Sequence, residues 1–188
     1  DPSGNKVGDD MKITAAEIFH EKYPQRDNVH YPLLQQRVEN PLLWTAETPN
    51  LYTLVLSLYD SEGALVEARS TKVGFREVKI SGQQFLVNGV PVKLYGVNRH
   101  DHSEFGGKSV TRQEMEADIR LMKQFNFNSI RTCHYPNDER FLDMCDERGI
   151  FVWEENHARG LTVEQMKNPH FEKQCEDCIA EMIENHYN

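Results

Sequence analysis

The sequence predicts a short antiparallel β-sheet segment followed by an α/β segment built on a parallel sheet. Residues 51–60 (LYTLVLSLYD) alternate with a period of two, which is typical of a β-strand. Residues 94–187 repeat the order strand–helix three times, and strands that alternate with helices form parallel sheets with right-handed crossovers. Three such units fit either a doubly wound sheet or the first part of a (β/α)8 barrel, and the pattern alone does not choose between them.

The first segment, residues 1–36, is polar and aperiodic, so we expect it to be rich in loops. Residues 12–23 have the composition of one short helix. Pro24 and Pro32 prevent that helix from continuing, because proline removes a backbone donor and breaks a helix.

Strands are expected in the next segment, residues 37–76. The sequence Asp-Ser-Glu-Gly at 60–63 is typical of a hairpin turn, and residues 64–75 form the return strand. Two or three strands are too few to be stable alone. We therefore predict that this segment is part of a β-sandwich whose earlier strands are absent or only partly present.

The α/β segment is expected to begin with hairpins that turn at Ser81-Gly82 and at Asn88-Gly89. The elements expected after them are strands over 95–100, 128–134 and 150–155, the first of them buried, and helices over 111–125, 137–148 and 168–187. Thr111 and Glu114 have the spacing of a capping box at the start of the first helix. Gly149 is a typical helix end. The first helix should face the core with Met115, Ile119, Met122 and Phe125.

Composition excludes several classes of partner. The net charge of −9 disfavours nucleic acid and anionic membranes. No apolar run approaches the roughly 20 residues that a membrane span needs, and residues 1–12 lack the apolar core of a signal peptide. The four cysteines are irregularly spaced, which indicates no disulfide framework and favours a reducing, cytoplasmic compartment.

Polar side chains follow each predicted strand of the α/β segment. They lie at residues 98–102, at Arg131 and His134, and at residues 154–157. Both doubly wound sheets and barrels bind their ligands at the carboxyl ends of parallel strands. We therefore expect these residues to border one site.

One long motif carries a family resemblance. Residues 128–153, NSIRTCHYPNDERFLDMCDERGIFVW, resemble the signature of glycoside hydrolase family 2: Asn-x-apolar-Arg, two small residues, His-Tyr-Pro, a helix, then Asp-x-x-Gly and four apolar residues. Upstream, VGFREV and FLVNGVPVKLYGVNRHDH resemble that family's junction between sandwich and barrel, and ENPLLWTAETPNLYTLVLSLYD resembles the closing strands of its sandwich. The resemblance covers residues 37–188.

The resemblance implies a fold and three segments. Residues 1–36 would be a loop-rich N-terminal segment, residues 37–76 the closing strands of a partial immunoglobulin-like β-sandwich, and residues 77–188 the N-terminal part of a catalytic domain. That domain would be a TIM (β/α)8 barrel, of which the chain carries the first three βα units.

The resemblance also implies a retaining β-glycosidase of the β-galactosidase type, with a β-galactoside as substrate. A β-glucuronidase or a β-mannosidase of the same family is the alternative enzyme, and a non-catalytic carbohydrate-binding or assembly fragment is the alternative of another class. The family's acid/base lies in a Gly-x-x-Asn-Glu type motif after the fourth barrel strand, and its nucleophile comes later. Both catalytic glutamates are therefore expected C-terminal to Asn188, and the isolated chain is expected to be inactive.

Four residues are carried over as substrate-binding. His100 and His134 match family histidines that contact sugar hydroxyls, since a neutral imidazole both donates and accepts hydrogen bonds. Asn98 and Arg131 stand beside them at the strand ends. The alternatives are a buried, hydrogen-bonded role for each histidine, a strand-end brace for Asn98, and a structural ion pair for Arg131.

Three further residues are assigned to active-site support: Glu154, Trp153 and Asp101. Glu154 is expected to be a buried partner for Arg131 or for a base on a neighbouring strand, rather than catalytic. Trp153 has an aromatic face that stacks on sugars. Asp101 either lines the mouth of the barrel or belongs to a solvated loop.

No metal or other cofactor is predicted for this chain. The best-known β-galactosidases carry an Ile-Glu-Thr-His-Gly magnesium site just past the third strand, and residues 156–161 do not reproduce it, although Mg2+ remains possible for the parent protein. Cys175 and Cys178 resemble half a zinc site but are expected to pack against the barrel, and Trp44 is expected in the core. An incomplete barrel has an exposed strand edge, so a homo-oligomer is expected.

Overall fold

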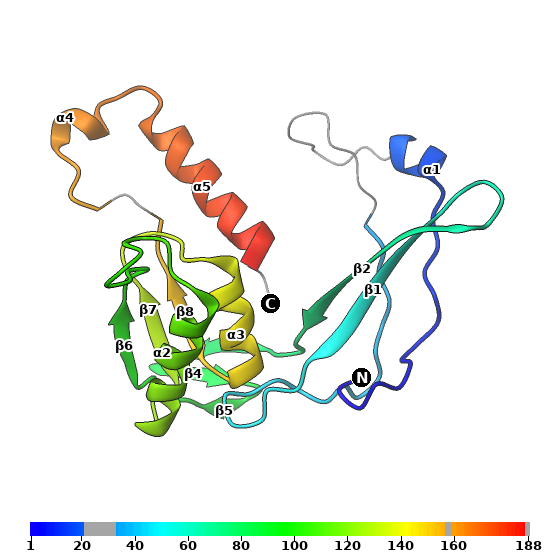
Figure 1. Cartoon of the computed structure of the whole chain (residues 1–188), viewed down its shortest axis with the longest axis horizontal. Helices are drawn as coiled ribbons and strands as arrows, with labels where there is room; N and C mark the ends of the chain where they lie inside the picture. The colour runs from blue at the N-terminus through cyan, green and yellow to red at the C-terminus, as the bar shows by residue number, and fades with distance from the viewer. Residues whose placement is uncertain (21–32, 157–158, 187–188) are drawn as a thin grey trace. The chain divides into compact units, whose positions relative to one another are not determined.

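The computed structural model describes residues 1–20, 33–156 and 159–186, which fall into two compact units (Figure 1). The smaller unit comprises residues 3–41 with Asp1, and the larger comprises residues 42–188 with Pro2. The smaller unit contains one helix, α1 (Ala15–His20). Thr14 and Glu17 cap it reciprocally, because the Glu17 carboxylate accepts from the Thr14 backbone N–H at 2.8 Å and Glu17 N–H donates to the Thr14 hydroxyl. The short helix expected within 12–23 is confirmed over the described residues, and residues 21–23 lie outside them.

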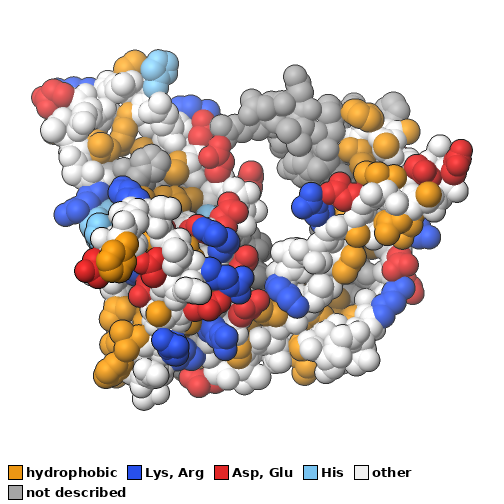
Figure 2. Space-filling view, in the orientation of Figure 1, with side chains coloured by type: hydrophobic (Ala, Val, Ile, Leu, Met, Phe, Trp, Pro, Cys, Tyr) orange, Lys and Arg blue, Asp and Glu red, His pale blue; other side chains and the backbone are white. Residues whose placement is uncertain are grey.

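The larger unit begins its regular structure with the hairpin formed by β1 (Tyr52–Tyr59) and β2 (Leu65–Val73). The strands are antiparallel, and Tyr52 pairs with Val73. Asp60 closes the turn, where its carboxylate accepts from the backbone N–H groups of Glu62 and Ala64. The predicted strands and turn are confirmed. Within the described residues the sheet has only these two strands, and Figure 2 shows hydrophobic side chains exposed along it.

A small meander follows, made of β3 (Val78–Ser81), β4 (Gln84–Val87) and β5 (Val90–Pro91). The chain turns at Gly82 and at Asn88-Gly89, as predicted. Asn88 and Gly89 both have positive φ, as the two central residues of a type I′ turn require. The Asn88 side chain also donates to the backbone carbonyl of Trp44 at 3.0 Å, which attaches the meander to the preceding segment.

The α/β segment contains a three-stranded parallel sheet in the order β6-β7-β8 (Figure 1). Its elements are β6 (Gly96–Arg99), α2 (Arg112–Gln124), β7 (Ser129–Thr132), α3 (Glu139–Arg148), β8 (Phe151–Glu154), α4 (Val163–Met166) and α5 (Phe171–His186). The predicted alternation of strands and helices is confirmed. The four-residue helix α4 was not predicted, although Thr162 and Gln165 form a capping box that the sequence displays.

The core lies between the parallel sheet and the helices α2 and α3. Its apolar side chains are Val110, Met115, Ile119, Met122, Ile130, Phe141, Met144, Cys145 and Ile150, with Phe127 and Val152 packed against them. Burying a side chain of this size contributes about 1.5–3 kcal/mol. The Thr111–Glu114 capping box begins α2, and Gly149, in the left-handed region at φ 69°, ends α3. Among the described residues, no helix has the length and apolar content needed to cross a bilayer.

Two expectations about burial need correction. β6 is not buried, because it is an edge strand and only Arg99 of its four residues is buried. Phe125 is 67% exposed, since it caps α2 at the point where the chain leaves the core. Trp44 is buried, as expected, but against the α/β segment rather than inside a sandwich. Its indole N–H donates to the Asp146 carbonyl at 2.8 Å, and its ring meets that of Phe151 edge-on.

Candidate functional site

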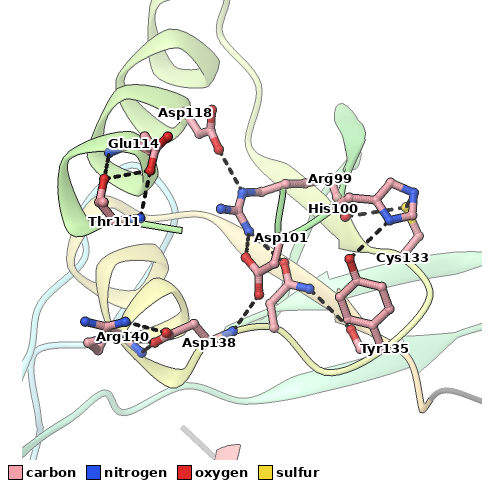
Figure 3. Close-up of polar contacts among 11 residues, drawn as sticks. Arg99, His100, Asp101, Thr111, Glu114, Asp118, Cys133, Tyr135, Asp138 and Arg140 are labelled. Atoms are coloured by element: carbon pink, nitrogen blue, oxygen red, sulfur yellow. Dashed lines mark hydrogen bonds and ion pairs between the residues drawn. The ribbon is translucent and has the colours of Figure 1, made fainter. Parts of the chain in front are cut away.

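The carboxyl ends of β6 and β7 bring two histidines side by side. His100 directly follows β6, and His134 lies two residues after β7. Because the strands are parallel and paired, their ends meet at one edge, and the centroids of the two imidazole rings are 5.0 Å apart. The Tyr135 hydroxyl lies 3.4 Å from His100 Nδ1, as Figure 3 shows. His100 is exposed and His134 is partly buried.

Cys133 lies beneath His100, and no sequence motif assigned it to the site. Its Sγ atom is 3.6 Å from His100 Nε2 and 3.5 Å from the Arg99 carbonyl oxygen (Figure 3). The side chain is only 2% exposed. The sequence feature that could have assigned Cys133 to the site is its position directly before His134 of the His-Tyr-Pro motif. Neighbours in the chain lie at the same strand end.

The surroundings of His134 favour its neutral form. Burial lowers the pKa of His134 below 6.5, and the nearby charge of Arg159 and the neighbouring His100 lower it further. Arg159 Nη1 is 3.3 Å from His134 Nδ1. Since a guanidinium has no acceptor, this nitrogen of His134 must accept the hydrogen bond.

Arg131 forms a two-pronged ion pair with Glu155, not with Glu154. The Nε and Nη2 atoms of Arg131 donate to the two carboxylate oxygens of Glu155 at 2.7 and 2.9 Å. This pairing raises the pKa of Arg131. Asn98 Oδ1 is 3.4 Å from Arg131 Nη1. The expected pairing of Arg131 with Glu154 is therefore wrong.

Glu154 points to the opposite face of the sheet. It pairs in register with Thr132, whereas Arg131 pairs with Trp153, so strand alternation separates Glu154 from Arg131. One oxygen of Glu154 is 2.7 Å from His186 Nδ1 on α5. Its other oxygen is buried without a hydrogen-bond partner among the described residues.

Arg99 connects the end of β6 to both core helices. Its Nε donates to Asp118 of α2 at 2.9 Å. Its Nη1 donates to Asp101 at 2.5 Å and to Asn137 at 2.8 Å. The guanidinium also lies 3.9 Å from the ring centroid of Phe141 of α3. Figure 3 shows the contacts of Arg99 with Asp101 and Asp118.

Asp101 is a partly buried link rather than a solvated loop residue. One oxygen accepts from Arg99, and the other accepts from the backbone N–H of Asp138 at 3.0 Å. Asp138 is the N-cap of α3. Asp101 thus holds the start of α3 to the loop that carries His100, and it acts on the site through other residues.

A cleft of about 780 Å³ opens beside these residues. It is lined by Arg76, Arg131, His134, Glu154, Glu155, Asn156, Arg159, Ile179, Met182, Ile183 and His186. Trp153 is 65% exposed on the same face of the sheet as Arg131. The cleft therefore combines imidazole, guanidinium and carboxylate groups with an apolar wall from α5. His157 lies outside the described residues.

Three described side chains place metal-ligating atoms close together, namely His100, Cys133 and His134, whose candidate atoms all lie within 4.8 Å of one another. Cys175 and Cys178 lie one turn apart on α5 as partly buried free thiols, and burial raises the pKa of Cys178.

Comparison with known proteins assigns both parts of the chain. The model described as "Glycosyl hydrolases family 2, TIM barrel domain" matches residues 78–188, and "Glycosyl hydrolases family 2" matches residues 4–76. The β-galactosidase of Photobacterium profundum is 48% identical over 118 residues, which are 63% of this chain and 12% of that protein. The β-galactosidase of Vibrio vulnificus is 48% identical over 129 residues, which are 69% of this chain and 12% of that protein. The chain thus spans about an eighth of the length of these relatives.

Solved structures resemble the chain over most of its length. A family 2 β-galacturonidase from Eisenbergiella tayi bound to galacturonate has a TM-score of 0.73 and 45% identity, covering 85% of this chain and 28% of that chain. A β-glucuronidase from Parabacteroides merdae has a TM-score of 0.69 and 33% identity, covering 79% of this chain and 18% of that one. The fold is therefore that of a family 2 sandwich domain joined to the start of a TIM barrel domain.

Proposed function

The chain belongs to glycosyl hydrolases family 2, and we propose that the protein of which it is a part is a retaining β-glycosidase that hydrolyses terminal β-D-galactosides. The observation that carries the proposal is the 5.0 Å separation of the His100 and His134 rings at the carboxyl edge of the parallel sheet. Active sites of TIM barrels lie at this edge. The relatives named β-galactosidase, at 48% identity, favour galactosides among the possible sugars.

In this proposal His100 and His134 hold hydroxyl groups of the terminal sugar. Neutral imidazole offers one donor and one acceptor, which suits a hydroxyl that both gives and takes a hydrogen bond. The lowered pKa of His134 favours this neutral form. Contacts that strengthen as the sugar ring distorts lower the barrier rather than only the dissociation constant.

Arg131 and Asn98 complete the sugar-binding edge. Because Glu155 already holds two N–H groups of Arg131, the guanidinium is fixed in position, and Nη1 remains near Asn98 for a sugar or a catalytic carboxylate. Trp153 offers its exposed face for stacking on the sugar.

Glu154 and Asp101 support the site from behind. Glu154 fixes α5 through His186, and Asp101 fixes the start of α3 through the Asp138 N–H. Neither is proposed to react. The two catalytic glutamates, which stand about 5–5.5 Å apart in a retaining glycosidase, are proposed to lie C-terminal to Asn188, and residues 1–188 alone are proposed to be inactive.

The same assignment divides the chain into three parts. We place a loop-rich segment at residues 1–36, closing strands of an immunoglobulin-like sandwich at 37–76, and the first three βα units of the eight-unit barrel at 77–188. In the described residues β8 pairs on one side only, with β7. Because such an edge pairs readily with other strands, the isolated chain is proposed to form homo-oligomers, which light scattering tests.

A uronide is the second candidate substrate. The solved relatives include a β-galacturonidase and a β-glucuronidase. The cleft also contains Arg159, which is exposed and stands beside His134, and a guanidinium is well suited to the carboxylate of a uronic acid. A β-mannosidase and a non-catalytic carbohydrate-binding or assembly fragment remain as outcomes of the test.

The test compares the full-length protein with residues 1–188 on nitrophenyl β-galactoside, β-glucuronide, β-galacturonide and β-mannoside. We expect turnover of the galactoside by the full-length protein and none by the isolated chain. A hydrogen bond between neutral groups that contributes about 0.5–1.5 kcal/mol corresponds to a loss of roughly 2- to 13-fold in kcat/KM for His100→Ala and for His134→Ala. The matched control is His170→Ala, an exposed histidine that does not line the cleft.

Two outcomes would refute parts of the proposal. Turnover of uronides in place of galactosides would refute the galactoside as substrate. A loss of kcat/KM in His170→Ala equal to that in His100→Ala would refute the sugar-binding role of the two strand-end histidines. If the full-length protein turns over none of these glycosides, the glycosidase proposal is refuted and the non-catalytic alternative is favoured.

A further inference from the structure

The strand ends contain a thiol that sugar binding does not use. Cys133 directly precedes His134 in the chain, and its Sγ atom lies 3.6 Å from His100 Nε2. Candidate ligand atoms of His100, Cys133 and His134 all lie within 4.8 Å of one another. Two imidazole nitrogens and one thiolate form a donor set that suits Zn2+ and similar thiophilic ions. We propose that these three residues, the His–Cys–His cluster, bind a thiophilic divalent cation such as Zn2+.

The spacing of the cluster agrees with tetrahedral coordination. Zinc bonds of about 2.0–2.1 Å to nitrogen and about 2.3 Å to sulfur place neighbouring ligand atoms roughly 3.3–3.7 Å apart. His100 Nε2 and Cys133 Sγ are already 3.6 Å apart. The remaining ligand atom, on His134, lies within 4.8 Å of the other two, so it needs to approach by at most about 1 Å to reach that spacing. A side-chain rotation supplies such a shift.

Tyr135 orients the first ligand. Its hydroxyl lies 3.4 Å from His100 Nδ1, which leaves His100 Nε2 directed toward the sulfur of Cys133 (Figure 3). Metal-binding histidines commonly use their second ring nitrogen in this way, and that contact fixes the tautomer and the ring orientation. His100 is exposed, so an ion reaches the cluster from solvent.

Binding exchanges a proton for the metal. The Cys133 thiol lies 3.5 Å from the Arg99 carbonyl oxygen, to which it donates. When the metal binds, the S–H bond breaks, a bond from sulfur to the metal forms, and the proton leaves to the buffer without any change of oxidation state.

Arg159 opposes the cation. Its Nη1 lies 3.3 Å from His134 Nδ1, and its positive charge repels a divalent ion bound by the same imidazole ring. Arg159 is exposed, so its side chain withdraws into solvent at little steric cost. Removal of this charge should therefore tighten metal binding, a change opposite in sign to that expected when a ligand is removed.

A consequence for regulation rests on the proposed sugar-binding function. The ring nitrogens that would hold the sugar hydroxyls are the ones that would hold the metal. Three protein ligands leave one coordination position for water, and the ion would occupy the space between the two rings. Zn2+ and the sugar should therefore compete, so that the metal inhibits the glycosidase.

The test uses Co2+ as a spectroscopic probe and Zn2+ in calorimetry on the 188-residue chain. We expect a thiolate-to-cobalt charge-transfer band with the visible d–d bands of a tetrahedral ion. Cys133→Ser should abolish the charge-transfer band and weaken Zn2+ binding at least about 10-fold, and His100→Ala should weaken it similarly. Arg159→Ala should strengthen binding. The matched control, Cys175→Ser/Cys178→Ser, removes the other cysteine pair and should change nothing.

The inference is overturned if the charge-transfer band persists in Cys133→Ser, or if the control variant abolishes it. Circular dichroism of each variant checks that the fold is kept, and His100→Ala, at an exposed position, provides a second ligand test if Cys133→Ser fails to fold. Galactose binding, followed by NMR on the same chain, separates the two proposals. A cobalt spectrum without sugar binding refutes the sugar site alone, and sugar binding without a cobalt band refutes the metal site alone.

Discussion

The interaction with the largest expected effect on stability is the buried Arg99 network, and Arg99→Met tests it. The Arg99 side chain is 7% exposed and forms ion pairs with Asp101, which is 13% exposed, and Asp118, which is 50% exposed. Methionine retains an apolar chain against the Phe141 ring while it removes the charge and all the hydrogen bonds. The Asp101 carboxylate then stays buried without its cation.

The expected loss in free energy of unfolding follows from this burial. Removing one partner of a buried pair costs about 3–5 kcal/mol, because an uncompensated charge is left behind. One nitrogen of Arg99, Nη2, is already buried without a partner among the described residues, and its removal relieves part of the desolvation cost. We therefore expect a loss near the lower limit, about 3 kcal/mol.

The control variant is Asp118→Asn, which removes the half-exposed partner of the same arginine. Exposed pairs contribute about 0–1 kcal/mol, so this variant should unfold close to the unmodified chain. Urea unfolding followed by circular dichroism and tryptophan fluorescence measures both. With a denaturant slope of about 1–3 kcal/mol per molar, Arg99→Met should lower the urea midpoint by roughly 1–3 M. Equal midpoints for Arg99→Met and Asp118→Asn would refute this reasoning.

Three further predictions concern a turn, a cap and the site. In urea unfolding, Gly149→Ala should destabilise the chain by more than the cost of a left-handed alanine, about 1–2 kcal/mol, because its Cβ would overlap the backbone carbonyl oxygen of Ala46. The control Gly63→Ala has positive φ but open space around its Cβ, so it should cost only the free energy of the left-handed backbone. Hydrogen bonds from neighbouring hydroxyl and backbone groups lower the pKa of Glu114 from 4.5 to about 2, so the ionised Glu114 stabilises the fold above pH 4.5 and this stabilisation is lost as pH falls toward 2. The difference in urea midpoint between Glu114→Gln and the unmodified chain should therefore shrink as pH falls from 4.5 toward 2. NMR titration should give His134 a pKa below 6.5, and Arg159→Ala should raise it, which an unchanged value would contradict.

Local signals in the sequence predicted most of the elements. The Thr111–Glu114 capping box and the left-handed Gly149 are encoded within a single turn of helix, so the ends of α2 and α3 follow from neighbouring residues. The period-two alternation of β1 depends only on its own side chains. Such features need no knowledge of the rest of the fold.

Contacts between distant segments were not predictable in the same way. Trp44 is 102 residues from Asp146, whose carbonyl accepts its indole hydrogen bond, and no pattern around Trp44 names that partner. Cys133 could be recognised as a core thiol, but its proximity to His100 depends on the pairing of β6 with β7. The family resemblance identified the histidines and gave no role to the cysteine between them.

The assignment of Glu154 and Glu155 depends on strand register, which the sequence of one strand does not contain. Arg131 pairs with Trp153, so these two side chains share a face of the sheet. Glu155 lies two residues beyond Trp153 and returns to that face, where it reaches Arg131, whereas Glu154 faces α5 and reaches His186. A slip of one residue between β7 and β8 would exchange the two glutamates. An acidic pair at a strand end therefore predicts a charged site, and only the neighbouring strand decides which carboxylate pairs with Arg131.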